Sequence, residues 1–322
     1  MIRLKFACLI ISLTFISTAF ASNVGMVIKK RGQAILYTNP SSIFSAKSNT
    51  LFEGKYYKMV KVKRGTKIKN GDILKTGSKS KVRVVFKNGD QFNVGEGTAY
   101  TVTWAQDTKI KKKTSTIRLL HGSLRGIISP KGPRNTMKVR TKNAVMGVRG
   151  TDFHFLQQGT SGHSHISVLR GKVQVQDLKQ KHKRVNVQQG FSANVISDLK
   201  KSKAPMQKKI VISQTSKPEL VMIQKHSTIK RSDDKLVSNE IKQEIESLEK
   251  KAIEVTLEDI KTHQPTIYED LKKRKITSLA SLNTTVVKKV YKTAPVKPAK
   301  ISIEELELNL DENAYDKYFT AE

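Results

Sequence analysis

The sequence predicts an all-β domain, an antiparallel β-sandwich or β-roll, followed by a charged tail that is partly helical and partly disordered. Three observations predict it. Short apolar–polar alternations broken by Gly, Asn, Ser and Pro fill residues 24–195, without helical periods between them. An Asn-Gly pair separates two β-rich runs. From about residue 233 onward, the apolar spacing becomes helical.

The expected strands follow the alternating runs, and Asn88-Gly89 marks the clearest hairpin. Both residues would take positive φ in a type I′ turn. Residues 39–58 are polar and predict a loop inserted between strands. The expected strands are 24–28, 33–37, 59–62, 81–87, 90–94, 99–104, 115–120, 136–141, 152–157, 165–169, 172–176 and 184–187.

The β domain should span residues 22–198, and a linker should span 199–232. Within that linker, the apolar islands 210–212 and 220–223 could add edge strands. A helical segment is expected over 233–283, with Asp233 or Asp234 as its N-cap and a break at Pro265. Its apolar seam would pair with a partner helix or with itself, and consists of Ile241, Ile245, Leu248, Ala252 and Val255. Residues 284–322 are expected to form an extended or disordered acidic tail, a docking arm or spacer without a core of its own.

The first 21 residues have the three parts of a secretory signal peptide. Arg3 and Lys5 precede a short apolar run, and Ala19 and Ala21 occupy the small-residue positions of a cleavage site. Cleavage after Ala21 would place the protein in the periplasm or outside the cell; an uncleaved signal anchor is the alternative. The single cysteine, Cys8, precedes most of the apolar run, which disfavours a lipoprotein anchor. No later apolar run has membrane length, so we expect a soluble mature chain without disulfides.

Charge is distributed unevenly. Residues 22–200 contain 35 Lys and Arg against 8 Asp and Glu, whereas residues 201–322 contain 23 against 19. A strongly positive surface attracts polyanions, and after export these would be envelope glycans, lipid phosphates or acidic proteins. General solubilising charge is the alternative. The candidate polyanion contacts are Lys109, Lys111, Lys112 and Lys113.

Few residues suggest catalysis or metal binding. His163 and His165 alternate along a strand, with His154 nearby in sequence, and could share a metal; an exposed loop is the preferred interpretation. No nucleophile elbow, Walker loop or paired carboxylates appear, so we expect neither enzyme activity nor a cofactor. Aromatic residues are sparse, which disfavours nucleic acid as a ligand.

Five blocks of the β region, in order, resemble the FecR domain family. They are Gly71–Ser80 with the 82–94 hairpin, Leu119–Arg125, Val139–Phe153, Val168–Val175 and Val187–Val195. The third block, which contains Val148-Arg149-Gly150-Thr151, matches the most specific part of the pattern. The motif residues carried over are Gly71, Asp72, Thr76, Gly77, Asn88, Gly89, Gly122, Arg149, Gly150, Thr151, Phe153, Gly171 and Gly190. The glycines should serve positive φ or close backbone approach, and Arg149 should pair locally with Asp152 or form turn hydrogen bonds.

The resemblance implies a regulatory or scaffolding role outside the cytoplasm. The best-known members of the family place a sigma-factor-binding segment ahead of a membrane helix, but only about five residues precede the apolar run here. We therefore expect no cytoplasmic sigma factor as partner. Two hypotheses remain: binding of envelope or periplasmic proteins, and binding of an anionic envelope polymer. A cell-wall hydrolase is a third, weaker one.

Overall fold

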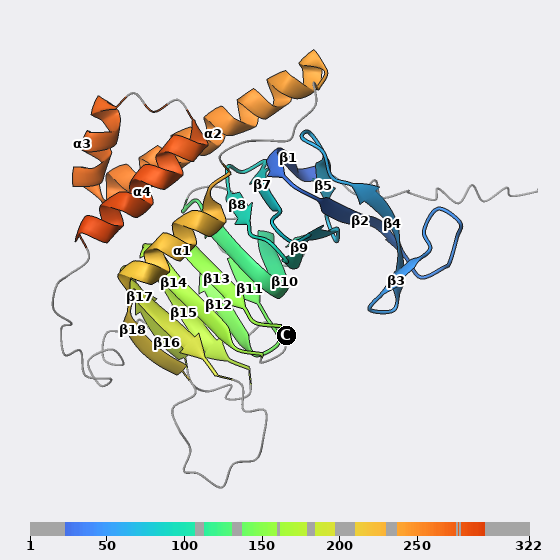
Figure 1. Cartoon of the computed structure of the whole chain (residues 1–322), viewed down its shortest axis with the longest axis horizontal. Coiled ribbons are helices and arrows are strands. Elements are labelled where there is room, and N and C mark those ends of the chain that lie inside the picture. Colours follow the sequence, from blue (N-terminus) through green and yellow to red (C-terminus); the bar gives the residue numbers. More distant parts are fainter. Residues whose placement is uncertain are drawn as a thin grey trace, which may run out of the picture.

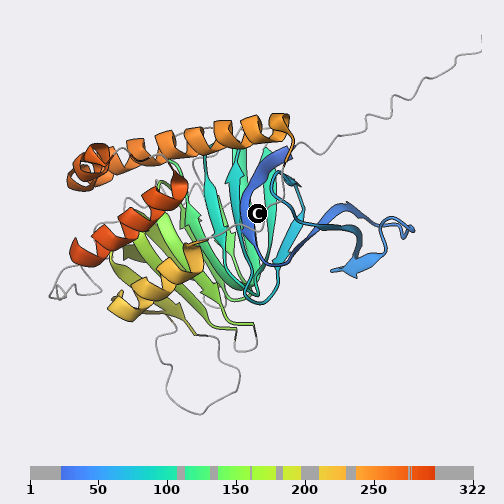
Figure 2. The same ribbon diagram turned by 45° about the horizontal axis from the view of Figure 1, so that its top comes forward.

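The computed structural model describes residues 23–106, 113–130, 137–159, 162–178, 184–196, 210–229, 237–274, 276 and 278–293. Its strands form one hydrogen-bonded ladder that folds into two packed sheets, which confirms the all-β fold class (Figures 1 and 2). Sheet A has the order β5 (Lys67–Lys69), β1 (Asn23–Arg31), β7 (Lys81–Phe86), β8 (Gln91–Val94), β10 (Lys113–Ile127), β13 (Asp152–Gln157), β14 (Ser164–Arg170), β17 (Phe191–Val195) and β18 (Ile210–Gln214). Sheet B has the order β3 (Thr50–Phe52), β4 (Lys55–Lys61), β2 (Ala34–Ser41), β6 (Ile73–Thr76), β9 (Ala99–Gln106), β10, β11 (Met137–Arg140), β12 (Ala144–Val148), β15 (Lys172–Asp177) and β16 (Arg184–Gln188).

Strand β10 belongs to both sheets. Its first half pairs with β9 and β11, and its second half, from Gly122, pairs with β8 and β13. The crossing requires glycine: Gly122 has φ 92°, and a Cβ there would lie 2.4 Å from Thr98 Cα. The pairing of β10 with β11 is parallel and departs from the expected antiparallel pattern. Apolar side chains from both sheets fill the space between them as one core.

Two turns differ from the sequence prediction. The hairpin at Asn88-Gly89 exists, but only Gly89 has positive φ, and Gly89 N donates to Phe86 O at 2.9 Å. That is a three-residue loop closed by a glycine bulge, so the predicted type I′ turn was wrong. A two-residue turn with positive φ at both positions occurs instead at Glu53-Gly54, between β3 and β4.

The predicted loop at residues 39–58 was also wrong. It contains the end of β2, all of β3 and most of β4, and β2 pairs with β4 from Ile35 to Ser41. We call residues 41–61 the arm, because they form the end of sheet B that extends beyond the sandwich (Figures 1 and 2). The polar composition of the segment hid the strands, since both of their faces lie largely in solvent.

Four helices follow the sheets: α1 (Lys217–Ser227), α2 (Asn239–His263), α3 (Pro265–Lys273) and α4 (Leu279–Thr293). The predicted linker therefore contains β18, as the first apolar island suggested, but the second island lies in α1. Ser216 and Glu219 form a capping box there, which favours helix over strand. Ser238, not Asp233 or Asp234, caps α2, and α3 begins at the break residue Pro265. Helix α4 extends into the residues expected to be an extended tail, and 294–322 lie outside the described residues.

The helical segment packs on the outer face of sheet A (Figure 2). Met26, Ile28 and Val85 of the sheet share a buried cluster with Ile245 and Ala252 of the seam. Because the core covers one face of this sheet and helices cover the other, β1 and β7 are buried over consecutive residues. The apolar residues of the helical segment thus form a second buried cluster with the outer face of sheet A, apart from the core between the two sheets.

Candidate functional site

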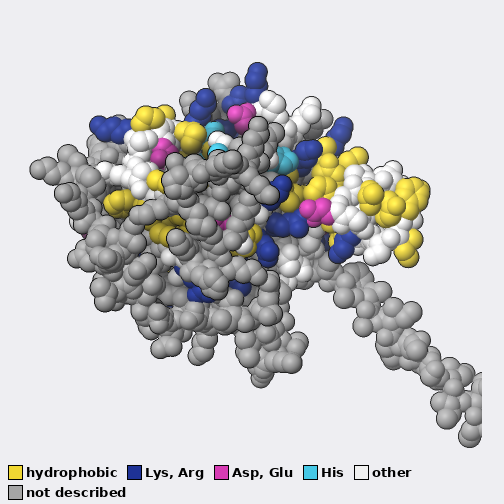
Figure 3. Space-filling model, turned by 90° about the horizontal axis from the view of Figure 1, so that it is seen from below, with side chains coloured by type: hydrophobic (Ala, Val, Ile, Leu, Met, Phe, Trp, Pro, Cys, Tyr) yellow, Lys and Arg dark blue, Asp and Glu magenta, His cyan; other side chains and the backbone are white. Residues whose placement is uncertain are grey.

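The arm carries most of the large apolar side chains that remain exposed among the described residues. Ile43 is 77% exposed, Phe44 61%, Leu51 59% and Met59 52%. In the space-filling view, hydrophobic side chains gather at the free end of the arm (Figure 3). Grouped apolar residues of this kind on a folded surface mark interaction sites more often than single exposed ones do.

Two of these side chains, Phe44 and Leu51, share one face of the arm with the half-buried Tyr56. The Phe44 and Tyr56 rings meet edge to face with centroids 5.5 Å apart, and Leu51 stands opposite Tyr56 in the β3–β4 ladder. Ile43 is the neighbour of Phe44 along the chain. We call Ile43, Phe44, Leu51 and Tyr56 the arm patch. Strand β3 pairs with β4 on one side, so its other edge can accept a further strand.

The charge around the arm patch is positive. Four lysines of the arm are exposed: Lys47, Lys55, Lys58 and Lys61. Glu53 is the one acidic residue between 41 and 61, and it pairs with Arg118 of β10. A ligand that combines apolar side chains with carboxylates would match both features of the arm.

The opposite side of the molecule, where the helices cover sheet A, contains three fully buried arginines. Arg125 Nε and Nη2 contact the carboxylate of Asp152 at 2.8 and 2.6 Å. Arg170 Nη2 lies 2.5 Å from Oδ2 of Asp259 on α2. Arg83 Nε donates to Asn93 Oδ1 at 2.6 Å, and burial lowers its pKa to about 10. Unpaired buried cations are costly, so the Arg170–Asp259 ion pair holds α2 on sheet A, whereas the other two contacts join neighbouring strands of the sheet. This face is covered by helices and is not an open binding surface.

The predicted helix seam is part of the same interface. Ile245 and Ala252 are fully buried, and Val255 lies next to Gly89, where an added Cβ would approach it to 3.1 Å. Thr256, one residue further along α2, bonds Gln91 of β8 at 2.8 Å. The seam was expected to pair with a partner helix or with itself, but it packs inside the chain, against the β domain and in one buried cluster with residues of α3 and α4.

Two of the three histidines, His154 and His165, lie beside α1. His165 Nδ1 faces Asn194 Oδ1 at 2.6 Å and its Nε2 faces Glu219 Oε1 at 2.7 Å. Burial alone would lower the pKa of His165, but these hydrogen bonds raise it above its ordinary value. Burial would raise the pKa of Glu219, but hydrogen bonds from His165, Ser167 and Ser192 lower it to about 2. This cluster fastens the start of α1 to β14 and β17.

The proposed metal ligands are not arranged around a common point. The ring of His165 is occupied by Asn194 and Glu219, and no group of three His, Cys, Asp or Glu in the described parts of the chain is placed to hold a metal ion. His163 is half-buried and His154 is fully buried. The cluster serves the α1 contact instead.

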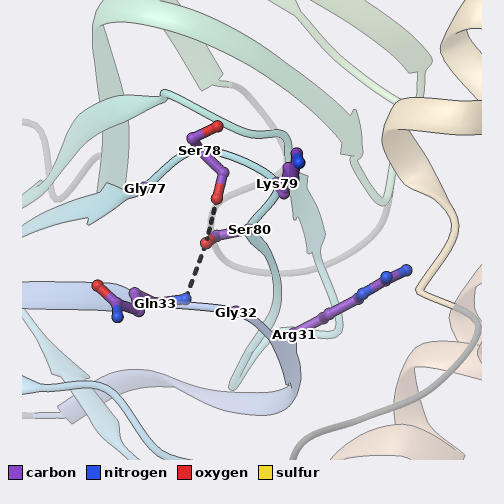
Figure 4. A pocket seen from close by; sticks show the side chains of 7 residues that line it. All are labelled: Arg31, Gly32, Gln33, Gly77, Ser78, Lys79 and Ser80. Atoms are coloured by element: carbon purple, nitrogen blue, oxygen red, sulfur yellow. Dashed lines mark hydrogen bonds between the residues drawn. The ribbon is translucent and has the colours of Figure 1, made fainter.

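A shallow hollow of about 430 Å³ lies between the β1–β2 and β6–β7 turns (Figure 4). Its polar groups already bond one another: Ser80 Oγ accepts from Gln33 N at 2.8 Å and donates to Ser78 O at 3.0 Å. Lys79 N donates to Glu96 at 2.9 Å. Hydrogen bonds within the two turns therefore occupy these polar groups, and Arg31 lies at the rim of the hollow. We do not interpret the hollow as a ligand site.

The family-motif residues build turns and core. Asp72 Oδ2 accepts from Lys69 N at 2.8 Å, and Thr76 Oγ1 donates to Gly95 O at 2.6 Å. Asp152 pairs with Arg125, so the expected local pair with Arg149 was wrong; Arg149 is exposed. Positive φ occurs at Gly71, Gly89, Gly122, Gly150, Gly171 and Gly190 but not at Gly77. Asn88 lies in a turn, Thr151 occupies a buried turn position, and Phe153 lies in the core.

Of the predicted polyanion contacts, Lys109, Lys111 and Lys112 lie outside the described residues, and Lys113 begins β10. The predicted signal peptide at 1–21 also lies outside them. The arm patch was missed by sequence reasoning. The signal that could have found it is the placement of Ile43-Phe44 and Leu51-Phe52 inside a polar stretch, where no helical or strand period required them.

Comparison with known proteins bears on the β region. The family model described as FecR protein matches residues 72–174. This chain carries a FecR domain. The match begins after the arm and ends before the helices, so the arm, β16 to β18 and α1 to α4 surround the part of the FecR domain that the family model covers.

Two crystal structures, at 1.65 and 2.50 Å, of a protein from Parabacteroides distasonis proposed to be an anti-sigma factor are also similar. Each is 15% identical, with 44% of this chain and 59% of that chain covered and a TM-score of 0.35. The chain thus spans less than two thirds of those structures, and the likeness is too distant to carry an argument. No curated protein matches. Among the described residues, no helix combines the length and apolar character needed to cross a membrane.

Proposed function

We propose that this protein is an exported, non-catalytic FecR-domain protein that works in the cell envelope by protein–protein contact, with the arm as its docking surface. The observation that carries the proposal is the exposure of Ile43, Phe44 and Leu51 on a projecting end of sheet B. Exposed apolar side chains of this size cost solubility unless a partner covers them at least part of the time.

Export is supported by the arrangement of Arg3, Lys5 and the Ala19–Ala21 site around a short apolar run. The absence of a catalytic role is supported by how the ionisable groups are used. Asp152 and Asp259 are occupied by buried arginines, and Glu219 by His165 and two serines. These groups hold elements together, so none of them is left in a cleft as an acid, base or nucleophile.

A photo-crosslinking amino acid placed at Phe44 in the native host tests the docking surface. Position Val221 is the matched control, because it is an apolar residue of α1 that is 60% exposed but lies far from the arm. We expect a discrete adduct with an envelope protein from position 44 and none from position 221. Equal labelling from both positions, or none from 44, would contradict the proposal. Fractionation of the same cells should recover a chain that starts at Ser22 in the envelope, and an intact chain in the cytosol would contradict export.

The alternative function is binding of an anionic envelope polymer, and its support is the large positive excess in residues 22–200. Retention on immobilised anionic glycan at low salt, lost steeply as salt rises and unaffected by Phe44→Ser, would favour it over the protein-binding role. Capture through the arm patch depends on apolar contact, so Phe44→Ser should abolish it at every salt concentration.

A further inference from the structure

The apolar and basic character of the arm points to a ligand that carries both apolar and acidic side chains. This step rests on the proposed function of the arm as a docking surface. The ligand should carry alternating apolar and acidic side chains, because the arm combines the arm patch with four exposed lysines and an edge strand. A strand added along that edge would place every second side chain on the patch.

The chain itself contains such a segment. Residues 301–312 read Ile-Ser-Ile-Glu-Glu-Leu-Glu-Leu-Asn-Leu-Asp-Glu, with leucines at 306, 308 and 310 and five acidic residues but no basic one. On a strand, this alternation would place the three leucines on one face and Glu305 and Glu307 on the other. No other stretch of this length in the chain combines alternating leucines with so much negative charge.

The position of α4 decides which copy of the arm this segment can reach. Asn283, near the start of α4, bonds Gln91 of β8, whereas Val287 packs against Leu169 of β14. Helix α4 therefore runs along sheet A toward β18, away from the β1 end where the arm leaves the sandwich (Figures 1 and 2). The connection from Thr293 to residue 301 spans at most about 29 Å when fully extended, and the body of the sandwich lies between. A second copy is better placed to receive the segment.

We propose that residues 301–312 of one copy dock on the arm patch of a second copy. Reciprocal exchange would give a closed dimer in which each arm holds the other chain's acidic segment. The charges favour the exchange, because the acidic segment offsets the repulsion between two strongly basic β domains. The expected contact pairs leucines with Phe44 and Leu51, and glutamates with the arm lysines.

Sedimentation of the full-length mature chain tests the proposal. We expect a dimer for the wild type and a dimer dissociation constant raised by at least about tenfold in two variants. One is Phe44→Ser with Leu51→Ser on the arm; the other is Leu306→Ser with Leu308→Ser and Leu310→Ser in the segment. Val221→Ser on α1 is the matched control and should dimerise like the wild type. All the arm substitutions are at exposed positions, so folding should be retained, and circular dichroism checks it.

Mixing the two variants separates exchange from other arrangements. The arm variant keeps a working segment and the segment variant keeps a working arm, so one junction can form and a mixed dimer should appear in native mass spectrometry. A wild-type monomer, or a dimer that survives loss of the three leucines, would overturn the proposal. So would a segment that crosslinks to the arm of its own chain. If dimerisation is unaffected while Phe44 still crosslinks an envelope protein, this inference fails and the proposed function stands.

Discussion

Two buried groups with oppositely shifted pKa values make opposing contributions to the stability of this protein at mildly acidic pH. Asp90 is fully buried, and burial raises its pKa to about 7 although Ser129 N and Asn88 donate to it. His154 is fully buried 5.8 Å from the ring of His226, and burial lowers its pKa to about 3. Asparagine at position 90 or phenylalanine at position 154 removes one group and leaves the other.

The sign of each contribution follows from proton binding. The folded state holds a proton on Asp90 below about pH 7, whereas the unfolded chain does so only below 3.8, so stability rises as pH falls through that window. His154 behaves in the opposite way: the unfolded chain binds its proton below 6.5 and the folded chain only below about 3, so stability falls over that window. Between pH 6.5 and 4.5 the two slopes cancel. Each is at most about 1.4 kcal/mol per pH unit, or about 3 kcal/mol over two units.

We therefore expect Asp90→Asn to lose up to about 3 kcal/mol of unfolding free energy between pH 6.5 and 4.5 relative to wild type, and His154→Phe to gain about as much. Urea unfolding at several pH values and fixed salt, followed by the fluorescence of the single tryptophan, Trp104, measures both. Glu254→Gln, an exposed carboxyl on α2, is the control and should parallel wild type. The other shifted groups are common to all variants and drop out of the difference. Parallel curves for Asp90→Asn and wild type would refute the reasoning.

Three further substitutions test the contacts that hold the helices. Asp259→Asn leaves Arg170 as an unpaired buried cation and should cost about 3–5 kcal/mol, seen in denaturant unfolding and in faster amide exchange of α2; unchanged exchange would contradict the role of this ion pair. Gly89 has a φ of 91°, which alanine adopts only at a cost, and an added Cβ would crowd the side chain of Val255 on α2. Gly89→Ala should therefore lower stability by about 1–2 kcal/mol in thermal melts. Glu219→Gln removes the charged acceptor of His165, so NMR titration should find the pKa of His165 lower than in wild type, with weaker exchange protection of α1; an unchanged titration would show that Glu219 does not set it.

The sequence predicted the strands of the FecR domain well because their signals are local. Residues 152–157 were expected as a strand and form β13 with the same bounds, and the Asn88-Gly89 hairpin lies where it was expected. Turn type was harder to predict, because it depends on how many residues close the ladder. Phe86 pairs with Asp90, which leaves three residues in the loop. The Asn88-Gly89 dipeptide alone does not determine which residues of the two strands pair.

The errors occur where tertiary contact decides. Residues 220–223 are apolar enough for a strand, but the capping box at Ser216 and burial of Leu220 and Ile223 against sheet A favour a helix. Asp152 was expected to pair within its own turn; its partner, Arg125, comes from a strand paired with β13 and is 27 residues away in sequence. The arm was missed because exposed strands lack the burial contrast on which alternation depends.

The lysines of the arm explain how it can expose apolar side chains on an edge strand without associating unspecifically. A projecting edge strand with exposed Phe44 and Leu51 invites indiscriminate pairing, and charged residues on such edges are the usual protection against it. Here all four arm lysines have the same sign, so they repel the basic β domains of other copies while leaving an acidic strand able to approach. The same charges thus keep a free arm soluble and select its ligand. A neutral apolar peptide should bind the arm more weakly than an acidic one of equal leucine content, because it gains the apolar contact without the attraction of the lysines.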